Sequence, residues 1–116
     1  MNLKTLHDDG LLAPSKIAAQ LRTTNREIAE TLGMPVDALQ RQERIKSTKT
    51  QTRIREMVEI LNKVEPRFGS ELMAYAWYRS EPLPGFDGQT AMALVRDGHG
   101  LAVLNYIDAV DDGVFA

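Results

Sequence analysis

The chain has 116 residues, of which 43% are hydrophobic and 26% charged, and its formal net charge is −2. This length predicts one domain or two very small ones, and the composition is that of a globular protein. Because the chain contains no cysteine, disulfides, thiolate zinc sites and cysteine nucleophiles are excluded. It has neither an apolar run of about 18 residues nor the pattern of a signal peptide, so we expect a soluble cytoplasmic protein with no membrane partner.

The near-neutral total hides an asymmetry between the two parts of the chain. Residues 1–67 carry 12 Lys and Arg against 9 Asp and Glu, a net charge of +3, whereas residues 68–116 carry 2 against 7, a net charge of −5. Six of the bases lie between Arg41 and Arg55, where Glu43 is the one acid. The asymmetry predicts two regions, 1–67 and 68–116, with different partners; a basic face that is merely solvated is the alternative.

Apolar residues at helical spacing recur along the chain, and no strand-like alternation is sustained, so we predict an all-α fold. The first helix begins at Pro14, a residue that suits the first helical position. Thr24 or Asn25 caps the second helix, which ends at Gly33. A third helix is predicted over residues 35–45, and its few apolar residues leave most of it facing water or a ligand.

The later elements follow a polar loop at residues 46–50. Residues 51–64 form the clearest amphipathic pattern of the chain, which we expect to end at Pro66. Residues 71–78 are apolar on nearly every side, which predicts burial against more than one neighbour. The remaining predicted elements are a Pro- and Gly-rich loop at 81–88, a helix at 91–96 capped by Thr90, and a last helix at 101–110.

The two short helices on either side of Gly33 have the layout of a helix-turn-helix. Ala29 is small where the helices would cross, and Leu39 anchors the second helix. Residues 13–64 therefore resemble the helix-turn-helix of Xre-type repressors. Gln42 departs from that pattern, because such motifs often have a bulky apolar residue there, and this predicts a recognition helix that is rotated or short at its end. An ordinary three-helix bundle shares the spacing and is the alternative.

The exposed side chains of this region indicate nucleic-acid binding. Three of them would project from the recognition helix into a major groove and read bases: Gln40, Arg41 and Arg44. Others are candidates for phosphate contacts: Lys46, Lys49, Arg53 and Arg55 along the basic stretch, with Thr24 and Arg26 at a helix start. One such unit makes few base contacts, so we expect a homodimer on operator DNA. The alternative is a solvated helix with long cationic side chains.

Residues 69–116 resemble the C-terminal toxin-binding domain of the Xre/MbcA/ParS antitoxins, in particular the MbcA branch. The resemblance is carried by a helix ending in Trp77, the loop Leu83-Pro84-Gly85, a Thr-capped helix with Leu94 and Gly98, and the final helix with its Gly113 tail. Ala91 departs from it, since many members have proline after the threonine, and this should loosen the start of that helix.

The resemblance implies an antitoxin of a type II toxin–antitoxin pair. Its partner would be a RES-domain toxin, an NAD-consuming enzyme whose active-site entrance is blocked by the antitoxin's last segment. Carried over to this chain, that role belongs to Asp111, Asp112, Gly113, Val114 and Phe115. The N-terminal region would repress the operon. From the residues alone, Gly113 could equally cap the helix, with Val114 and Phe115 folding back on it. A stand-alone helix-turn-helix regulator with a dimerising C-terminal half is the competing function.

Enzymatic chemistry finds little support in the sequence. His7 and His99 are the only histidines and lie far apart in the chain. Neither has a partner at metal-ligand spacing, and no phosphate-binding or nucleophile motif is present. We therefore predict neither catalysis nor a metal or other cofactor.

Overall fold

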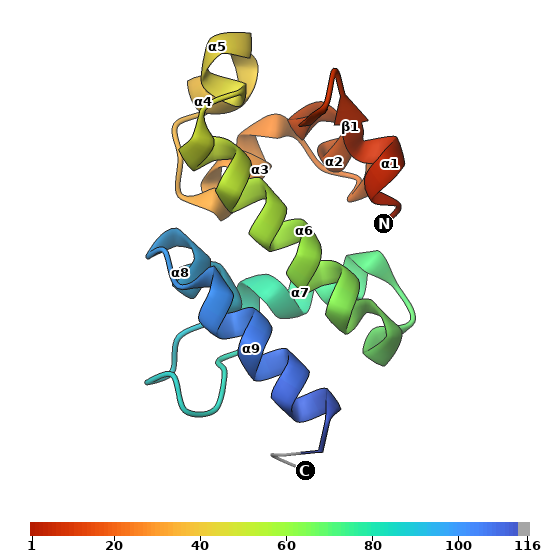
Figure 1. Cartoon of the computed structure of the whole chain (residues 1–116), viewed down its shortest axis with the longest axis vertical. Helices are drawn as coiled ribbons and strands as arrows, with labels where there is room; N and C mark the ends of the chain where they lie inside the picture. The colour runs from red at the N-terminus through yellow and green to blue at the C-terminus, as the bar shows by residue number, and fades with distance from the viewer. Residues whose placement is uncertain (114–116) are drawn as a thin grey trace. The chain divides into compact units, whose positions relative to one another are not determined.

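The computed structural model describes residues 1–113, and these are mostly helical, as predicted (Figure 1). The helices are α1 (Leu3–Leu6), α2 (Pro14–Gln20), α3 (Asn25–Leu32), α4 (Asp37–Gln40), α5 (Gln42–Ile45), α6 (Thr48–Phe68), α7 (Glu71–Ser80), α8 (Ala91–Arg96) and α9 (Gly100–Asp111). Two short strands, β1 (His7–Asp8) and β2 (Leu11–Leu12), form an antiparallel hairpin. The chain divides into two compact units within α6: unit 1 is Met1–Arg55, and unit 2 begins at Glu56.

The hairpin at the start of unit 1 is not among the predicted elements. His7 pairs with Leu12, and the turn between the strands places Asp9 at φ 52° and Gly10 at φ 79°. Positive φ at both central residues is the backbone of the tight turn that Asp-Gly favours, because it matches the twist of the two strands. The strands are only two residues long, so no alternating pattern could reveal them.

Helices α2 and α3 follow the sequence prediction closely. Pro14 is the first residue of α2. The Thr24 hydroxyl accepts a hydrogen bond from the Glu27 amide at 3.1 Å and so caps α3, which ends at Gly33 in the left-handed conformation, φ 68°. Apolar residues of these helices form the core of unit 1 with one residue of α6: Ile17, Ala18, Leu21, Ile28, Ala29, Leu32 and Ile54.

The third predicted helix, over residues 35–45, is wrong as a single element. The backbone is extended at Arg41, with ψ 127°, and this residue divides the segment into the one-turn helices α4 and α5. Leu39 before the break and Ile45 after it are both buried. A continuous helix would place these two residues at a spacing of six, on different faces. The extended residue at Arg41 reorients the chain, and both side chains reach the interior.

Helix α6 is longer than predicted at both ends. The Ser47 hydroxyl accepts from the Thr50 amide at 3.2 Å, so the helix begins at Thr48 inside the predicted loop. The helix also continues through Pro66, where we expected it to end. A proline in the last turn removes only one of the few backbone hydrogen bonds that remain there. Gly69, at φ 72°, ends the helix instead, and its amide donates to the Glu65 carbonyl at 2.9 Å.

A buried glutamine of α6 joins three elements of unit 1. The Gln51 amide accepts from the Leu12 amide at 2.9 Å and donates to the Leu12 and Ile45 carbonyls at 3.1 and 2.9 Å. The side chain is only 6% exposed. It therefore ties the hairpin and the end of α5 to the first turn of α6.

In unit 2, α6 and α9 lie side by side and run in the same direction (Figure 1). Lys63 and Arg67 form ion pairs with Asp108 and Asp111, both at 2.7 Å. The core beneath them is formed by apolar residues of four helices: Met57, Val58, Ile60, Leu61, Val64, Ala74, Tyr75, Tyr78, Leu94, Val95, Val103 and Ile107.

The 71–78 segment, which is apolar on nearly every side, is not buried throughout. In α7, Ala74, Tyr75 and Tyr78 are buried, whereas Leu72 and Met73 are 39% and 56% exposed. The helix is therefore buried on one side and leaves a second apolar surface in solvent.

Candidate partner-binding and nucleic-acid surfaces

The end of α9 carries the segment that the sequence assigned to toxin binding. Gly113 has φ 80°, and its amide donates to the Val110 carbonyl at 2.9 Å, so it terminates the helix. The Asp111 carboxylate accepts from the Arg67 guanidinium at 2.7 Å, while Asp112 and Gly113 are exposed. The remaining predicted residues, Val114 and Phe115, lie outside the described residues. Asp112 is thus an exposed carboxylate one residue beyond the Asp111 that pairs with α6.

Two ion pairs join the C-terminal part of α9 to α6. Lys63 and Arg67 are one turn apart on α6, as are Asp108 and Asp111 on α9. The hydrogen bond that the Lys63 ammonium donates to the Asp108 carboxylate is the main reason that the pKa of Lys63 is raised. All four side chains are partly exposed, so the pairs orient the two helices more than they stabilise them.

A groove that the sequence did not reveal lies beside the same end of α9. It has a volume of about 640 Å³ and is lined by the 84–86 loop and one face of the helix: Pro84, Gly85, Phe86, Ala102, Asn105, Tyr106, Ala109 and Val110. The Phe86 and Tyr106 rings meet edge to face, with centroids 5.6 Å apart. No lining residue is charged. The Pro- and Gly-rich composition of the loop was the available signal, but it predicts a loop and not which helix the loop covers.

The loop that lines this groove is held in place by its own backbone. The Leu83 amide donates to the Gln89 carbonyl at 2.9 Å, and Leu83 itself is only 4% exposed. Pro82 and Thr90 form a bridge at the base of the loop, and the Thr90 hydroxyl caps α8. One side of the groove is therefore a loop that is closed by backbone hydrogen bonds and held by the buried Leu83 side chain.

The predicted DNA-binding residues are spread over four helices of unit 1. Thr24 caps α3 and Arg26 lies in its first turn, so both are at one helix start. Along α4 to α6, Gln40 ends α4, Arg41 is the extended residue, Arg44 lies in α5, Lys46 follows it, and Lys49 is in the first turn of α6. All of these residues are exposed. Because of the break at Arg41, the three predicted base-reading residues do not project from one continuous helix.

Arg53 has a partner within unit 1. Its guanidinium donates to the Leu32 and Gly33 carbonyls at 3.0 and 3.3 Å, so it binds the C-terminal end of α3. Carbonyls at a helix end carry partial negative charge, and a cation there is favourable. Arg53 therefore positions α3 against α6, a role that the sequence did not indicate.

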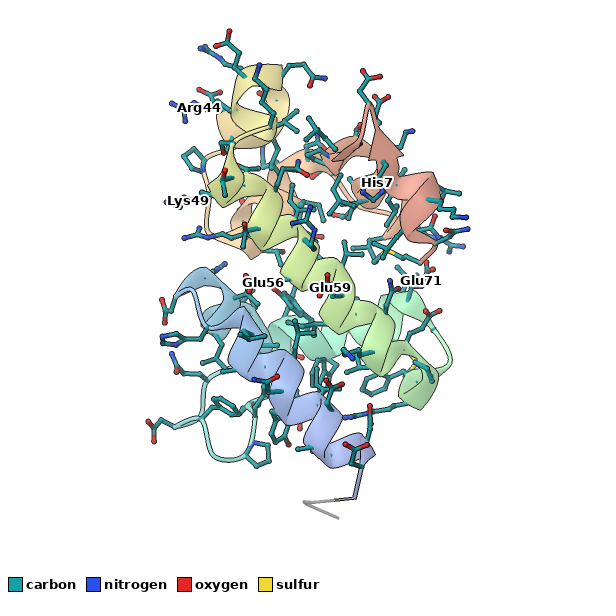
Figure 2. The ribbon with its side chains drawn as sticks, viewed as in Figure 1. His7, Arg44, Lys49, Glu56, Glu59 and Glu71 are labelled. Carbon is teal, nitrogen blue, oxygen red and sulfur yellow. The ribbon has the colours of Figure 1, made fainter. Side chains whose placement is uncertain are left out.

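Two of the predicted cations share a hollow on unit 1. Arg44 and Lys49 line a cavity of about 560 Å³ with the turn residues Gly33, Met34 and Pro35. Figure 2 shows both side chains on the same side of the unit, one from α5 and the other from the start of α6. This places two cations beside the turn between α3 and α4.

The two histidines of the chain belong to different units. His7 lies within 2.6 Å of the Leu3 carbonyl in the hairpin region, and His99 joins α8 to α9. Residues 1–113 contain no group of three His, Asp or Glu side chains that could hold a metal ion. Within the same range no helix is both long and apolar enough to span a membrane.

Comparison with known families identifies the C-terminal part of the chain. Residues 63–113 match the family described as the antitoxin Xre/MbcA/ParS C-terminal toxin-binding domain. The likeness to the Xre/MbcA/ParS antitoxin family lies in this segment. The match begins in the last turns of α6 and ends at Gly113, so the antitoxin domain contains the ion pairs, the groove and the acidic end of α9. A toxin-binding domain implies a protein toxin as partner. No curated protein and no solved structure matches the chain significantly.

Proposed function

We propose that this chain is the cytoplasmic antitoxin of a type II toxin–antitoxin pair and neutralises a RES-domain, NAD-consuming toxin. Residues 68–116 would bind the toxin, and residues 1–67 would bind DNA. The observation that carries the proposal is the toxin-binding antitoxin domain at residues 63–113. The account requires no catalytic residue, metal or cofactor in this chain.

The proposed mechanism is physical blockage of the toxin's active site by the end of the chain. Asp111, Asp112 and Gly113 stand at the end of a helix that the Lys63 and Arg67 pairs orient. An enzyme that binds an anionic dinucleotide presents cationic groups at its pocket, and exposed carboxylates are complementary to them. Val114 and Phe115 would supply the apolar part of the inserted segment.

Co-expression tests this mechanism. The chain should restore growth to cells that express its RES-domain partner toxin. Deletion of residues 111–116 should abolish the rescue and leave the circular-dichroism spectrum and melting of the chain nearly unchanged. Arg67→Ala separates loss of the ion pair from loss of the segment, because it removes the partner of Asp111 without shortening the chain. Full rescue by the shortened chain would exclude the insertion mechanism.

We further propose that unit 1 binds the operator of its own operon as a homodimer, through a helix-turn-helix formed by α3 and α4. The support is the exposed cations around the α3–α4 turn, including Arg44 and Lys49. The break at Arg41 shortens the recognition helix, so base reading would come from Gln40, Arg41 and Arg44 as separate contacts. Lys46, Lys49 and the start of α3 at Thr24 and Arg26 would bind phosphates. Arg53, held by carbonyls, could reach a phosphate only with its remaining donors.

DNA-binding assays distinguish the residues that read bases from those that bind phosphates. Arg41→Ala and Arg44→Ala should reduce the preference for operator over unrelated DNA, whereas Lys49→Ala should weaken both equally and lower the salt dependence by about one phosphate contact. Glu43→Ala is a matched control on the same surface. If all three cation variants affected operator and unrelated DNA alike, α4 and α5 would not read bases.

The second candidate function is a stand-alone helix-turn-helix regulator whose C-terminal half serves dimerisation. The observation in its favour is the exposed apolar stripe of α7, with Leu72 and Met73 at 39% and 56% exposure. The pair Leu72→Ser and Met73→Ser should then convert a dimer to a monomer in light scattering and abolish operator binding. In the antitoxin account, the same variant retains neutralisation of the toxin.

A further inference from the structure

We propose that the groove between the 84–86 loop and α9 receives an apolar ridge of the toxin that is flanked by Lys or Arg. This inference rests on the proposed antitoxin function and adds a second contact, separate from the inserted end of the chain. We name this surface the α9 groove, and Pro84, Phe86, Ala102, Asn105, Tyr106 and Ala109 are its main lining residues.

The shape of the groove suits a segment of protein. Its volume of about 640 Å³ is large enough for several side chains. Ala102 and Ala109 form its floor along α9 with small side chains, and Gly85 has none, so another backbone can approach closely. The Phe86 and Tyr106 rings, packed edge to face, supply a wall that is already formed before binding. Preformed aromatic walls lose little conformational entropy on association.

The apolar surface extends beyond the groove along the exposed face of α9. Leu101 is 66% exposed, the highest value among the large exposed hydrophobic residues of the described chain. Leu101, Asn105 and Ala109 are spaced by four residues, so they lie along one face of the helix. The Asn105 amide is also exposed and can bond to the backbone of a bound segment. An exposed leucine beside a groove with an apolar lining suits a helix-in-groove interface.

The charges around the groove determine the chemistry of the partner. No lining residue is charged, but an exposed carboxylate, Asp87, follows Phe86 directly in the loop. From residue 68 onward the chain has only Arg79 and Arg96 as bases. An apolar ridge with cationic flanks is complementary to this arrangement, whereas an acidic partner would be repelled.

The test measures binding of this chain to the purified RES-domain toxin that it neutralises in co-expression. Ala109→Trp fills the α9 groove, and Ala76→Trp is the matched control, because Ala76 is an exposed helical alanine of α7 outside the groove. We expect Ala109→Trp to weaken binding at least about tenfold, the effect of losing a central interface contact, and Ala76→Trp to leave it within about twofold. Both variants must retain the wild-type circular-dichroism spectrum. If Ala109→Trp does not, it is replaced by Ala102→Glu, at an exposed position of the groove lining, with the same expected loss of binding.

Charge reversal tests the cationic flanks. Asp87→Lys should slow association and reduce its salt dependence, whereas Glu81→Lys, an exposed acid outside the groove lining, should change it less.

The outcomes separate this inference from the function on which it depends. If wild-type chain binds the toxin, deletion of residues 111–116 weakens that binding, and Ala109→Trp and Ala102→Glu do not, the groove is not a contact and the antitoxin function stands. If wild-type chain does not bind the toxin, both proposals fail. If Ala109→Trp instead converts a dimer of this chain to a monomer, the groove holds a second copy and the inference is overturned.

Discussion

Gln51 provides the sharpest test of how unit 1 is held together. Its amide makes three hydrogen bonds, to the Leu12 amide and to the Leu12 and Ile45 carbonyls, at 2.9 to 3.1 Å. Gln51→Met keeps the length of the side chain but leaves these three backbone groups without that partner in a site only 6% exposed. An unsatisfied buried polar group costs about 1–3 kcal/mol, and carbonyls relax more easily than amides, so we expect a total loss of about 2–4 kcal/mol.

Urea unfolding measures this loss, with Thr52→Ala as the control because Thr52 is the exposed neighbour on α6. Hydrogen exchange locates it: the Leu12 amide should lose protection first, together with the amides of α5. Gln51→Glu should also destabilise unit 1 near pH 7, since an ionised carboxylate would face two carbonyls. That site raises the folded-state pKa of the introduced carboxyl, so the lost stability returns as the pH falls below it. A change below about 0.5 kcal/mol for Gln51→Met would refute the reasoning.

Three further stability predictions rest on single features. Tyr78 is fully buried, burial raises the pKa of its hydroxyl, and the hydroxyl oxygen has no hydrogen-bond partner within residues 1–113. Tyr78→Phe should therefore stabilise unit 2 by about 1 kcal/mol in urea unfolding, whereas Tyr75→Phe should not. A Cβ at position 100 would overlap the Glu56 carboxylate, the flexible end of a side chain, so Gly100→Ala should be more favourable in a Glu56→Ala background than in the wild type; equal effects in both backgrounds would contradict this. Arg22 follows α2 at φ 56°, where glycine is favoured. Arg22→Gly should therefore raise the free energy of unfolding by about 0.5–1 kcal/mol, and with it the midpoint of thermal unfolding. A lower midpoint would show that the arginine side chain contributes a contact.

Local signals in the sequence predicted the helix ends well. Thr24 and Thr90 cap the helices that they were expected to cap, and Gly33 and Gly113 have the left-handed backbone that ends a helix. Caps and helix-ending turns depend on a few neighbouring residues, and a threonine hydroxyl or a glycine without Cβ is enough to form them. The Asp9-Gly10 turn carried the same kind of signal, but its strands are too short to support a prediction.

Features that depend on tertiary structure were not predicted. The break at Arg41 follows from burying both Leu39 and Ile45, which no helical periodicity at residues 35–45 shows. The exposure of Leu72 and Met73 depends on how many elements surround α7.

The candidate site was predicted only in part. The acidic end of α9 was expected from the family resemblance, but the pairing of Asp111 with Arg67 was not, because the two residues are distant in sequence. The α9 groove also requires a loop and a helix to meet, which composition alone cannot indicate.

The central claim is that this chain neutralises an NAD-consuming toxin through its C-terminal domain. The most direct measurement is NAD consumption by the purified RES-domain partner toxin, titrated with the chain of residues 1–116 and with the chain lacking residues 111–116. The account predicts that the chain of residues 1–116 stops NAD consumption at a fixed molar ratio and that the shortened chain does not. Undiminished NAD consumption in the presence of an excess of the chain of residues 1–116 would contradict it.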